Sequence, residues 1–405
     1  MAKFRAALLK YLLFSLSAAV FFLSLWIILP APNLLLLTLS VGAPEVSPWL
    51  LVGNATLFLI TLQGAKRTRI HQIALVLSMT GLLVSLSPLS QFSTVAQRAD
   101  VAMNQAFGTH YLHQLPKAVL ARMRTTSFDF IDALRGIPIQ KTVRYTPNVP
   151  FAKPAGVSLN LDVYRPPQVG QYPAIVVIHG GAWRSGSPAN NTEFNRYMAS
   201  QGYVVWAIAY RLAPHYQFPT QIEDVQAALA FIKHHATQYE TDPTRLAVMG
   251  RSAGAQLAML AAFAPDESIR ALVNYYGPID LTAGYRDVPT PDPINSRDVL
   301  KSFLGGSPEE RPELYQQASP IRYITAPTAH PLPPSLLIYG GRDHIVQSKY
   351  GRILEQRLQS VGAQAAMIEI PWADHAFDTV FNGVSNQLAL YHTERFLAWA
   401  LKVKD

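Results

Sequence analysis

Residues 242–263 read DPTRLAVMGRSAGAQLAMLAAF, and this stretch predicts a buried strand, a tight turn and a helix in direct succession. The apolar run Leu246–Met249 suits a strand that is covered on both faces, as in a parallel sheet packed between helices. Gly250 and Gly254 flank the turn, where glycine permits a tight backbone and close packing. Their G-x-S-x-G spacing predicts that the hydroxyl of Ser252 projects above the end of the strand.

The same alternation of strands and helices extends outward from this stretch. Short apolar runs predict six strands of the main sheet, at Ala174–Ile178, Val204–Ile208, Leu246–Met249, Leu272–Tyr275, Leu336–Tyr339 and Met367–Ile370. Two earlier strands, expected to be antiparallel, are predicted at Thr142–Tyr145 and Leu159–Tyr164. Apolar residues from Ile222 to Ile232 recur at helical spacing. The sequence therefore predicts an α/β domain over residues 138–405, with a mostly parallel sheet covered by helices.

Two further loops carry the residues that would make a serine reactive. A serine hydroxyl is a poor nucleophile until a base takes its proton, and the base needs an orienting acid. Asp343 lies in the loop beyond strand Leu336–Tyr339, and His375 lies in the loop beyond strand Met367–Ile370. Both loops leave the same edge of the predicted sheet as Ser252. We therefore expect Ser252 as nucleophile, His375 as base and Asp343 as acid, in the chain order of hydrolases built on such a sheet.

The segment HGGAW at 179–183 closes the earlier strand Ala174–Ile178. Glycines in such a loop let backbone N–H groups approach a carbonyl oxygen without interference from a Cβ atom, and such donors stabilise a developing oxyanion. The amide of Ala253, at the start of the helix after the serine, can donate to the same oxyanion. Trp183 and Tyr210 are expected to border the substrate pocket, with packing as the alternative reading. The long segment 281–320 is likewise expected to border the pocket, with packing as the alternative.

Other polar residues are weaker candidates for the acid of the triad or for a metal site. Asp280 follows a strand that is one too early for the usual acid, and Asp374 and His344 are interpreted as polar groups of the loops that hold His375 and Asp343. His110 and His113 have the spacing of one helix face, but no partnering carboxylate is nearby, so no metal site is predicted.

Together these segments resemble the α/β-hydrolase superfamily, particularly its bacterial esterase branch related to hormone-sensitive lipase and feruloyl esterase-like proteins. The resemblance covers residues 140 to 403. It is carried by LDVYRP at 161–166, HGGAW at 179–183, AYRLAP at 209–214, DPTRLAVMGRSAG at 242–254, GGRD at 340–343 and DHAF at 374–377. It implies the triad Ser252, Asp343 and His375, with oxyanion amides from Gly180, Gly181 and Ala253. Ala182 departs from the third glycine of many hormone-sensitive lipase relatives, which favours the feruloyl esterase-like branch.

The N-terminal quarter, residues 1–90, has the composition of a membrane region and lies outside the resemblance. No Asp, Glu, Lys or Arg occurs between Lys10 and Glu45, and the run Tyr11–Leu29 is long enough to cross a hydrocarbon core of roughly 30 Å. A cleaved signal peptide is the rival interpretation, but its apolar core would be shorter. Two further apolar stretches, Asn33–Gln63 and Ile70–Leu89, bring the expected number of spans to three, with two or four as alternatives. Within the first of them, Trp49–Leu62 is the expected spanning portion, extended by a kinked or interfacial start.

The basic residues of this region predict an orientation. They precede the first span or separate the second from the third, at Lys3, Arg5, Lys10, Lys66, Arg67 and Arg69. The positive-inside rule places both clusters in the cytoplasm, so three spans would deliver the catalytic domain to the non-cytoplasmic side. Residues 91–137 follow as a helical linker, with Phe92, Val95 and Ala99 on one helix face; a cap over the active site is the alternative.

Composition excludes several other classes of protein. The net charge is +8, but the basic residues form no stripe interleaved with aromatic residues, so a nucleic-acid partner is not expected. The absence of cysteine excludes a thiolate nucleophile, a disulfide framework and a zinc–sulfur site. The sequence thus predicts a membrane-anchored serine hydrolase of small-molecule esters that needs no cofactor or metal. The alternatives are an amide-cleaving hydrolase, a transferase or lipid-modifying enzyme, and a catalytically silent binding domain. The sequence indicates neither an oligomeric state nor a natural substrate.

Overall fold

A computed structural model describes the chain except for residues 1, 64–67, 140–141, 265–268, 326–330 and 403–405. Its centre is an eight-stranded sheet of order β1-β2-β4-β3-β5-β6-β7-β8. The strands are β1 (Arg144–Ala152), β2 (Leu159–Arg165), β3 (Tyr172–Ile178), β4 (Val204–Ile208), β5 (Thr241–Arg251), β6 (Ala271–Tyr275), β7 (Ser335–Gly340) and β8 (Ala365–Ile370). β1 and β2 are antiparallel to their neighbours, and the strands from β4 to β8 are parallel to one another.

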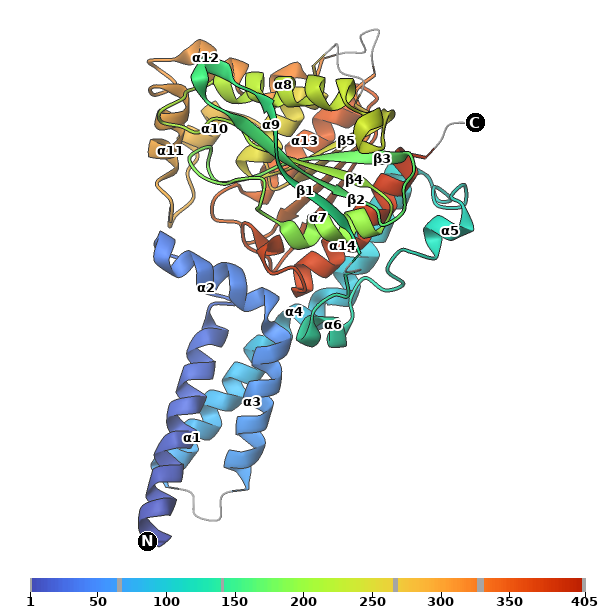
Figure 1. The fold of residues 1–405 in the computed structure, drawn as a ribbon. Helices are drawn as coiled ribbons and strands as arrows, with labels where there is room; N and C mark the ends of the chain where they lie inside the picture. The colour runs from blue at the N-terminus through green and yellow to red at the C-terminus, as the bar shows by residue number, and fades with distance from the viewer. Residues whose placement is uncertain (1, 64–67, 140–141, 265–268, 326–330, 403–405) are drawn as a thin grey trace.

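Helices cover both faces of this sheet, which explains why its central strands read as continuous apolar runs. Every residue of β4 and of β7 is buried. The helices of the domain are α7 (Thr192–Ser200), α8 (Thr220–His234), α9 (Ala253–Ala262), α10 (Leu281–Arg286), α11 (Ser296–Leu304), α12 (Pro312–Gln317), α13 (Ser348–Ser360) and α14 (Val384–Ala400). In Figure 1, α8, α9 and α13 lie on one side of the sheet, and α7 and α14 lie on the other. The predicted α/β architecture is confirmed, although β1 begins at Arg144 and runs to Ala152, beyond the predicted Tyr145.

The first four helices of the chain make up its N-terminal part. α1 (Ala2–Leu25), α3 (Ser47–Leu62) and the first half of α4 (Arg69–Phe107) form a bundle that projects from the domain, whereas α2 (Leu34–Glu45) lies across the end of the bundle that meets the domain (Figure 1). α2 and α3 are bent by 78° at a short break. The apolar stretch Asn33–Gln63 is therefore two helices of different direction: α3 contains the predicted spanning portion Trp49–Leu62, and α2 corresponds to its predicted kinked start.

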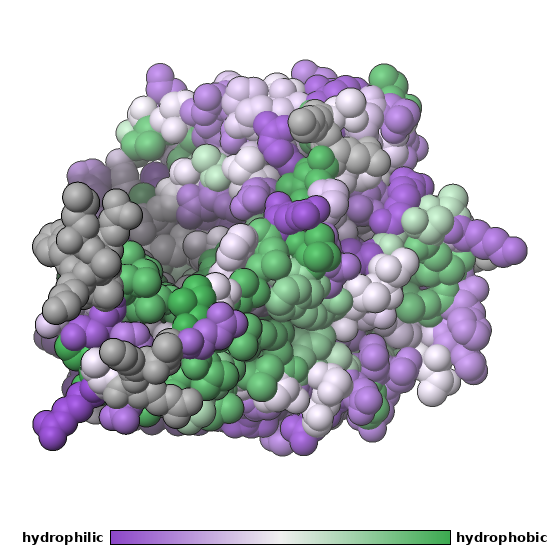
Figure 2. Space-filling model, turned by 90° about the horizontal axis from the view of Figure 1, so that it is seen from below, coloured by the Kyte–Doolittle hydropathy of each residue, from purple (hydrophilic) through white to green (hydrophobic). Residues whose placement is uncertain are grey.

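Among the residues that the structure describes, α1 and α4 have the length and composition to cross a membrane, and there are up to three candidate spans if the bent pair α2–α3 is counted as one. Apolar side chains gather in the middle of the face seen along the bundle, and hydrophilic residues surround them at the periphery (Figure 2). The basic residues Lys66 and Arg67, which the orientation prediction uses, lie outside the described residues.

Polar side chains meet inside the bundle. Asn54 of α3 donates to the hydroxyls of Ser24 in α1 and Ser85 in α4, over 2.9 and 3.3 Å. Gly81 lies against this amide, because a Cβ atom there would come within 2.3 Å of Oδ1 of Asn54. Small residues and interhelical hydrogen bonds of this kind hold helices together where no hydrophobic driving force acts between them.

α4 belongs to both parts of the molecule. It has 39 residues and is about 58 Å long, roughly twice the thickness of a hydrocarbon core. One buried stripe follows its whole length, with small residues such as Ala74 and Gly81 in the bundle and large ones such as Phe92 and Phe107 against the catalytic domain. The helix runs without a break through residue 90, where the sequence predicts the boundary between membrane region and linker.

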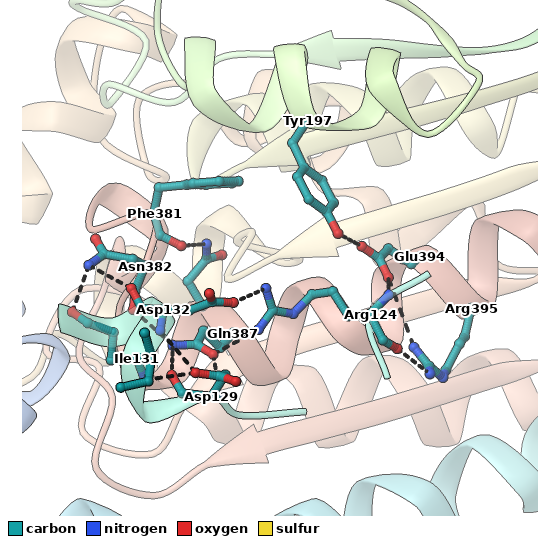
Figure 3. Close-up of polar contacts among 12 residues, drawn as sticks. Arg124, Asp129, Ile131, Asp132, Tyr197, Phe381, Asn382, Gln387, Glu394 and Arg395 are labelled. Carbon is teal, nitrogen blue, oxygen red and sulfur yellow. Dashed lines mark hydrogen bonds and ion pairs between the residues drawn. The ribbon is translucent and has the colours of Figure 1, made fainter. Parts of the chain in front are cut away.

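The remainder of the predicted linker contains α5 (Lys117–Leu120) and α6 (Phe130–Arg135) and is held on α14 by polar contacts (Figure 3). Glu394 accepts a 3.0 Å hydrogen bond from the amide of Arg124, and Gln387 accepts 2.8 Å bonds from the Arg124 guanidinium and the amide of Asp129. This segment therefore packs along the surface of the catalytic domain.

Candidate active site

Ser252 occupies the sharp turn between β5 and α9. Its backbone has φ 52° and ψ −123°, a strained conformation for a residue with a side chain. The two flanking glycines are required sterically, because a Cβ atom at Gly250 would lie 2.2 Å from the carbonyl oxygen of Gly254, and one at Gly254 would lie 2.2 Å from that of Ile178. The turn leaves the hydroxyl at the carboxyl edge of the sheet.

The loops after β7 and β8 bring an imidazole and a carboxylate to this hydroxyl. Nε2 of His375 lies 2.8 Å from Oγ of Ser252, and its Nδ1 lies 2.8 Å from Oδ2 of Asp343. The other oxygen of Asp343 accepts hydrogen bonds from the amides of Ile345 and Val346, at 2.8 and 2.7 Å. The three predicted residues therefore form one continuous hydrogen-bonded chain, in which the acid is fixed by its own loop.

The electrostatic surroundings of His375 favour its protonated form. Burial alone would lower the pKa of the imidazole, but the Asp343 carboxylate beside it, with further contributions from Asp374 and Asp378, outweighs burial and raises the pKa above its usual 6.5. His179, in contrast, is buried without a carboxylate partner, and burial lowers its pKa to about 4. His179 is therefore neutral at physiological pH, consistent with its expected role in shaping a loop.

The glycines of the 179–183 loop lie directly beside the serine. A Cβ atom at Gly180 would lie 2.9 Å from the carbonyl oxygen of Arg251 and 3.3 Å from Cβ of Ser252. Gly181 has φ +118°, a conformation that favours glycine. Ala253 is the first residue of α9, where backbone N–H groups lack partners within the helix. Gly180 and Gly181 thus line the same pocket as Ser252, and Ala253 follows the serine at the start of α9.

The side chains of Trp183, the last residue of this loop, and of Tyr210 are both buried. The indole N–H of Trp183 donates to Gln256 over 3.0 Å, and the ring stacks on Phe303. The hydroxyl of Tyr210 donates to the carbonyl of His179 over 3.0 Å. Both are buried, and neither is among the described residues that line the pocket. They support the loop from within the core, and the packing alternative describes their surroundings better than substrate contact does.

A pocket of about 630 Å³ opens above Ser252. Its apolar wall includes Ile294 and Val299 from the long segment 281–320, together with Ile345 and Phe381. Leu34, the first residue of α2, also lines it. Residues 91–137, weighed as a cap, are not among the described residues of this lining.

A buried ion pair forms another part of the wall, and sequence reasoning did not identify it. The guanidinium of Arg251 donates to Asp378, which also accepts from the hydroxyl of Tyr276, and all three residues line the pocket. The ring of Tyr276 lies 4.6 Å from that of His375. Arg251 fills the variable position of the G-x-S-x-G motif, so its place next to the serine was the signal available in the sequence.

Asp374 is more than a polar loop group, because it joins the histidine loop to the N-terminal helices. It accepts hydrogen bonds from the amide of His375 at 2.8 Å and from the hydroxyl of Ser40 in α2 at 2.5 Å. Nδ1 of His344 lies 3.2 Å from the same carboxylate. Burial would raise the pKa of Asp374, but these hydrogen bonds outweigh it and lower the pKa. The other rival acid, Asp280, caps α10 through the amide of Ala283.

Comparisons with known proteins find one family model and several esterases. The BD-FAE family model matches residues 161–358. Esterase LipC of Mycobacterium tuberculosis is 34% identical over 54% of this chain and 57% of its own. The esterase of Pyrobaculum calidifontis superposes with a TM-score of 0.55 over 77% of this chain and 92% of its own, at 20% identity, which speaks for the fold.

Residues 161–358 thus resemble the BD-FAE family, and the chain is similar to α/β-hydrolase esterases related to hormone-sensitive lipase.

Other relatives differ in how much of the chain they match. Esterase LipQ of M. tuberculosis is 29% identical over 73% of this chain and 74% of its own, which is more than residues 138–405 contain, so that match extends into the N-terminal part. The isoprenylcysteine alpha-carbonyl methylesterase ICME of Arabidopsis thaliana is 29% identical over 51% of each chain. Against LipC and ICME, the chain spans little more than half the length of the relative.

Proposed function

We propose that this protein is a carboxylic-ester hydrolase that uses Ser252, His375 and Asp343 as a catalytic triad. The observation that carries the proposal is the pair of 2.8 Å contacts that joins the hydroxyl, the imidazole and the buried carboxylate. Relatives named as esterases support the same reaction class.

In the proposed reaction, Oγ of Ser252 attacks the acyl carbon while Nε2 of His375 takes its proton. Asp343 holds the Nδ1–H tautomer and stabilises the imidazolium. Collapse of the tetrahedral intermediate breaks the bond between the acyl carbon and the alkoxy oxygen, and His375 passes its proton to the leaving alcohol. A water molecule then attacks the acyl-enzyme, giving its proton to His375 and its hydroxide to the acyl carbon. Return of that proton to Ser252 releases the acid.

The negative charge of the tetrahedral intermediates needs donors that are already in place. Amides of Gly180, Gly181 and Ala253 are the proposed donors, because two of them belong to the loop packed against Ser252 and the third opens α9. Donors fixed before the reaction are effective because they do not have to reorient as the charge develops.

We further propose that residues 1–90 anchor the enzyme in a bilayer, that residues 91–137 link the anchor to the domain, and that residues 138–405 carry the reaction. The apolar window Leu8–Leu25 and the apolar helix α4 support the anchor. The start of α1, the end of α3 at Leu62 and the start of α4 at Arg69 lie at the end of the bundle far from the catalytic domain (Figure 1). This arrangement supports the predicted orientation, with the domain on the non-cytoplasmic side.

The test is hydrolysis of p-nitrophenyl acetate by the full-length protein and by Ser252→Ala. Loss of the nucleophile should lower kcat by about 10⁶-fold, whereas Ser360→Ala, at an exposed hydroxyl near the end of α13, should retain full activity. Activity that survives in Ser252→Ala would refute the proposal. Parallel assays with p-nitroacetanilide separate an esterase from an amidase, and protease protection of intact membranes tests the orientation.

A further inference from the structure

The first turn of α2 connects the proposed anchor to the active-site pocket. Leu34, the first residue of α2, lines the pocket together with Ser252 and His375. Leu34 and Leu35 nevertheless have exposed fractions of 65% and 81%. Leu34 therefore borders the mouth of the pocket, and its chain neighbour Leu35, which is not among the lining residues, is still more exposed.

The direction of α2 places these leucines at the junction between the helical bundle and the catalytic domain. α2 is bent by 78° from α3 and lies across the end of the bundle, directly beneath the domain (Figure 1). If the bundle crosses a bilayer, α2 lies along its surface. From Leu34 to Val41 the helix contains no ionisable side chain, which suits contact with the boundary between headgroups and acyl chains.

Buried polar contacts hold α2 in this place. Glu45 accepts hydrogen bonds from the amide and hydroxyl of Ser385, at 2.8 and 2.5 Å, at the start of α14. Ser40 donates to Asp374, and Arg342 donates to the carbonyl of Leu29 over 3.0 Å. The leucines are thus fixed relative to Ser252, so the mouth stays next to the bilayer surface.

We infer that the substrates are ester lipids that reside in the bilayer and enter the pocket past Leu34 and Leu35. This inference rests on the proposed ester hydrolysis and on the proposed anchor. An acyl chain leaving the bilayer passes over the exposed leucines and then meets the apolar wall formed by Ile294, Val299 and Phe381. The apolar side chains on this path replace the apolar contacts that the acyl chain loses when it leaves the membrane. The acyl chain therefore does not have to cross water.

The experiment uses the full-length protein in vesicles of ether-linked phosphatidylcholine, which itself has no ester bond. Two probes share one leaving group: p-nitrophenyl palmitate, which resides in the bilayer, and p-nitrophenyl acetate, which dissolves in water. For the wild type, hydrolysis of the palmitate ester should be fast when enzyme and ester share the same vesicles and slow when they are in separate vesicles. Equal rates in the two arrangements would overturn the inference.

A matched pair of variants tests the path itself. Leu35→Asp places a charge on the exposed turn and should lower kcat/KM for the palmitate ester in shared vesicles by about tenfold, the factor that corresponds to loss of one leucine contact. Its hydrolysis of the acetate ester should be unchanged. Val169→Asp, at a position with 82% exposure in the loop between β2 and β3, should change neither rate, and Leu35→Met should keep both.

The outcomes separate this inference from the proposed function. If acetate hydrolysis is absent, or does not depend on Ser252, the proposed function fails. If acetate hydrolysis depends on Ser252 but the palmitate rate responds neither to Leu35→Asp nor to shared vesicles, only the route from the bilayer fails. Equal losses for both probes in Leu35→Asp also contradict the route, because they would assign Leu35 a purely structural role.

Discussion

The hydroxyl of Ser40, in the N-terminal helix α2, donates a 2.5 Å hydrogen bond to Asp374, the residue before His375. The two residues are 334 positions apart, and both are buried. Asp374 also accepts a hydrogen bond from the backbone amide of His375. The N-terminal helices therefore contribute directly to the loop that holds the proposed base.

We expect Ser40 to act as a positioning residue. Ser40→Ala leaves an oxygen of Asp374 without one of its buried partners, which should lower the free energy of unfolding by about 1–3 kcal/mol and lower kcat for p-nitrophenyl acetate with little change in KM. Ser40→Thr retains a hydroxyl and should recover most of the activity. Thr38→Ala, at an exposed hydroxyl of the same helix, is the matched control. A fall in stability with kcat unchanged would show that Ser40 has no positioning role.

The pH dependence of the reaction should report the raised pKa of His375. The base works only when the imidazole is neutral, so kcat/KM should fall as the pH drops through a pKa above 6.5. Asp343→Asn removes the carboxylate that raises this pKa and leaves burial to lower it. The fall of kcat/KM at acid pH (the acid limb) should therefore move to lower pH. In addition, kcat should decrease by about 10⁴-fold, as it does when other triads lose their orienting acid. Asp374→Asn should move the limb in the same direction by less. An acid limb that stays in place in Asp343→Asn would contradict the assigned base.

Gly180 should tolerate no side chain. In Gly180→Ala the new Cβ would lie 2.9 Å from the carbonyl oxygen of Arg251, so the loop must move away from Ser252. Losing a donor to the oxyanion lowers kcat by about 10²–10³-fold, and we expect a loss of this size with a smaller effect on KM. Gly284→Ala is the control, because no atom lies within 4 Å of the position of its Cβ. Steady-state kinetics of the two variants test this prediction. If Gly180→Ala is as active as Gly284→Ala, Gly180 is not part of the oxyanion site.

The buried pair of Arg251 and Asp378 should matter for stability. Arg251→Met leaves the carboxylate of Asp378 buried without its cationic partner, while the hydroxyl of Tyr276 still donates to it. Breaking one half of such a pair costs about 3–5 kcal/mol, which thermal or denaturant unfolding of the purified protein can measure. The double variant Arg251→Met with Asp378→Asn should recover part of this loss. A single variant as stable as the wild type would show that the pair contributes nothing to the fold.

The parts of this protein that could be predicted from its sequence are those set by local patterns. The strand before Ser252, the turn at Gly250 and Gly254, and the loops of Asp343 and His375 each follow from a short apolar run and the residues next to it. A parallel sheet brings the ends of such strands to one edge, so the meeting of the three side chains follows from topology alone.

The parts that could not be predicted depend on how distant surfaces pack. Nothing near Leu34 or Ser40 in the sequence indicates that α2 folds back onto the histidine loop, because the partner lies more than 300 residues away. Trp183 and Tyr210 adjoin motifs of the site, but a sequence does not tell whether an aromatic ring faces a pocket or the core behind it. The continuous α4 likewise combines a membrane-like half with a half that packs on the domain, so a change in composition did not mark the end of a helix.

The most direct test of the triad is the site of covalent labelling by a fluorophosphonate probe, determined by peptide mass spectrometry on the full-length protein. The account predicts one adduct per chain, on the peptide that contains Ser252, and its loss in both Ser252→Ala and His375→Ala. Labelling at another serine, or labelling that persists at Ser252 without His375 at the wild-type rate, would contradict it.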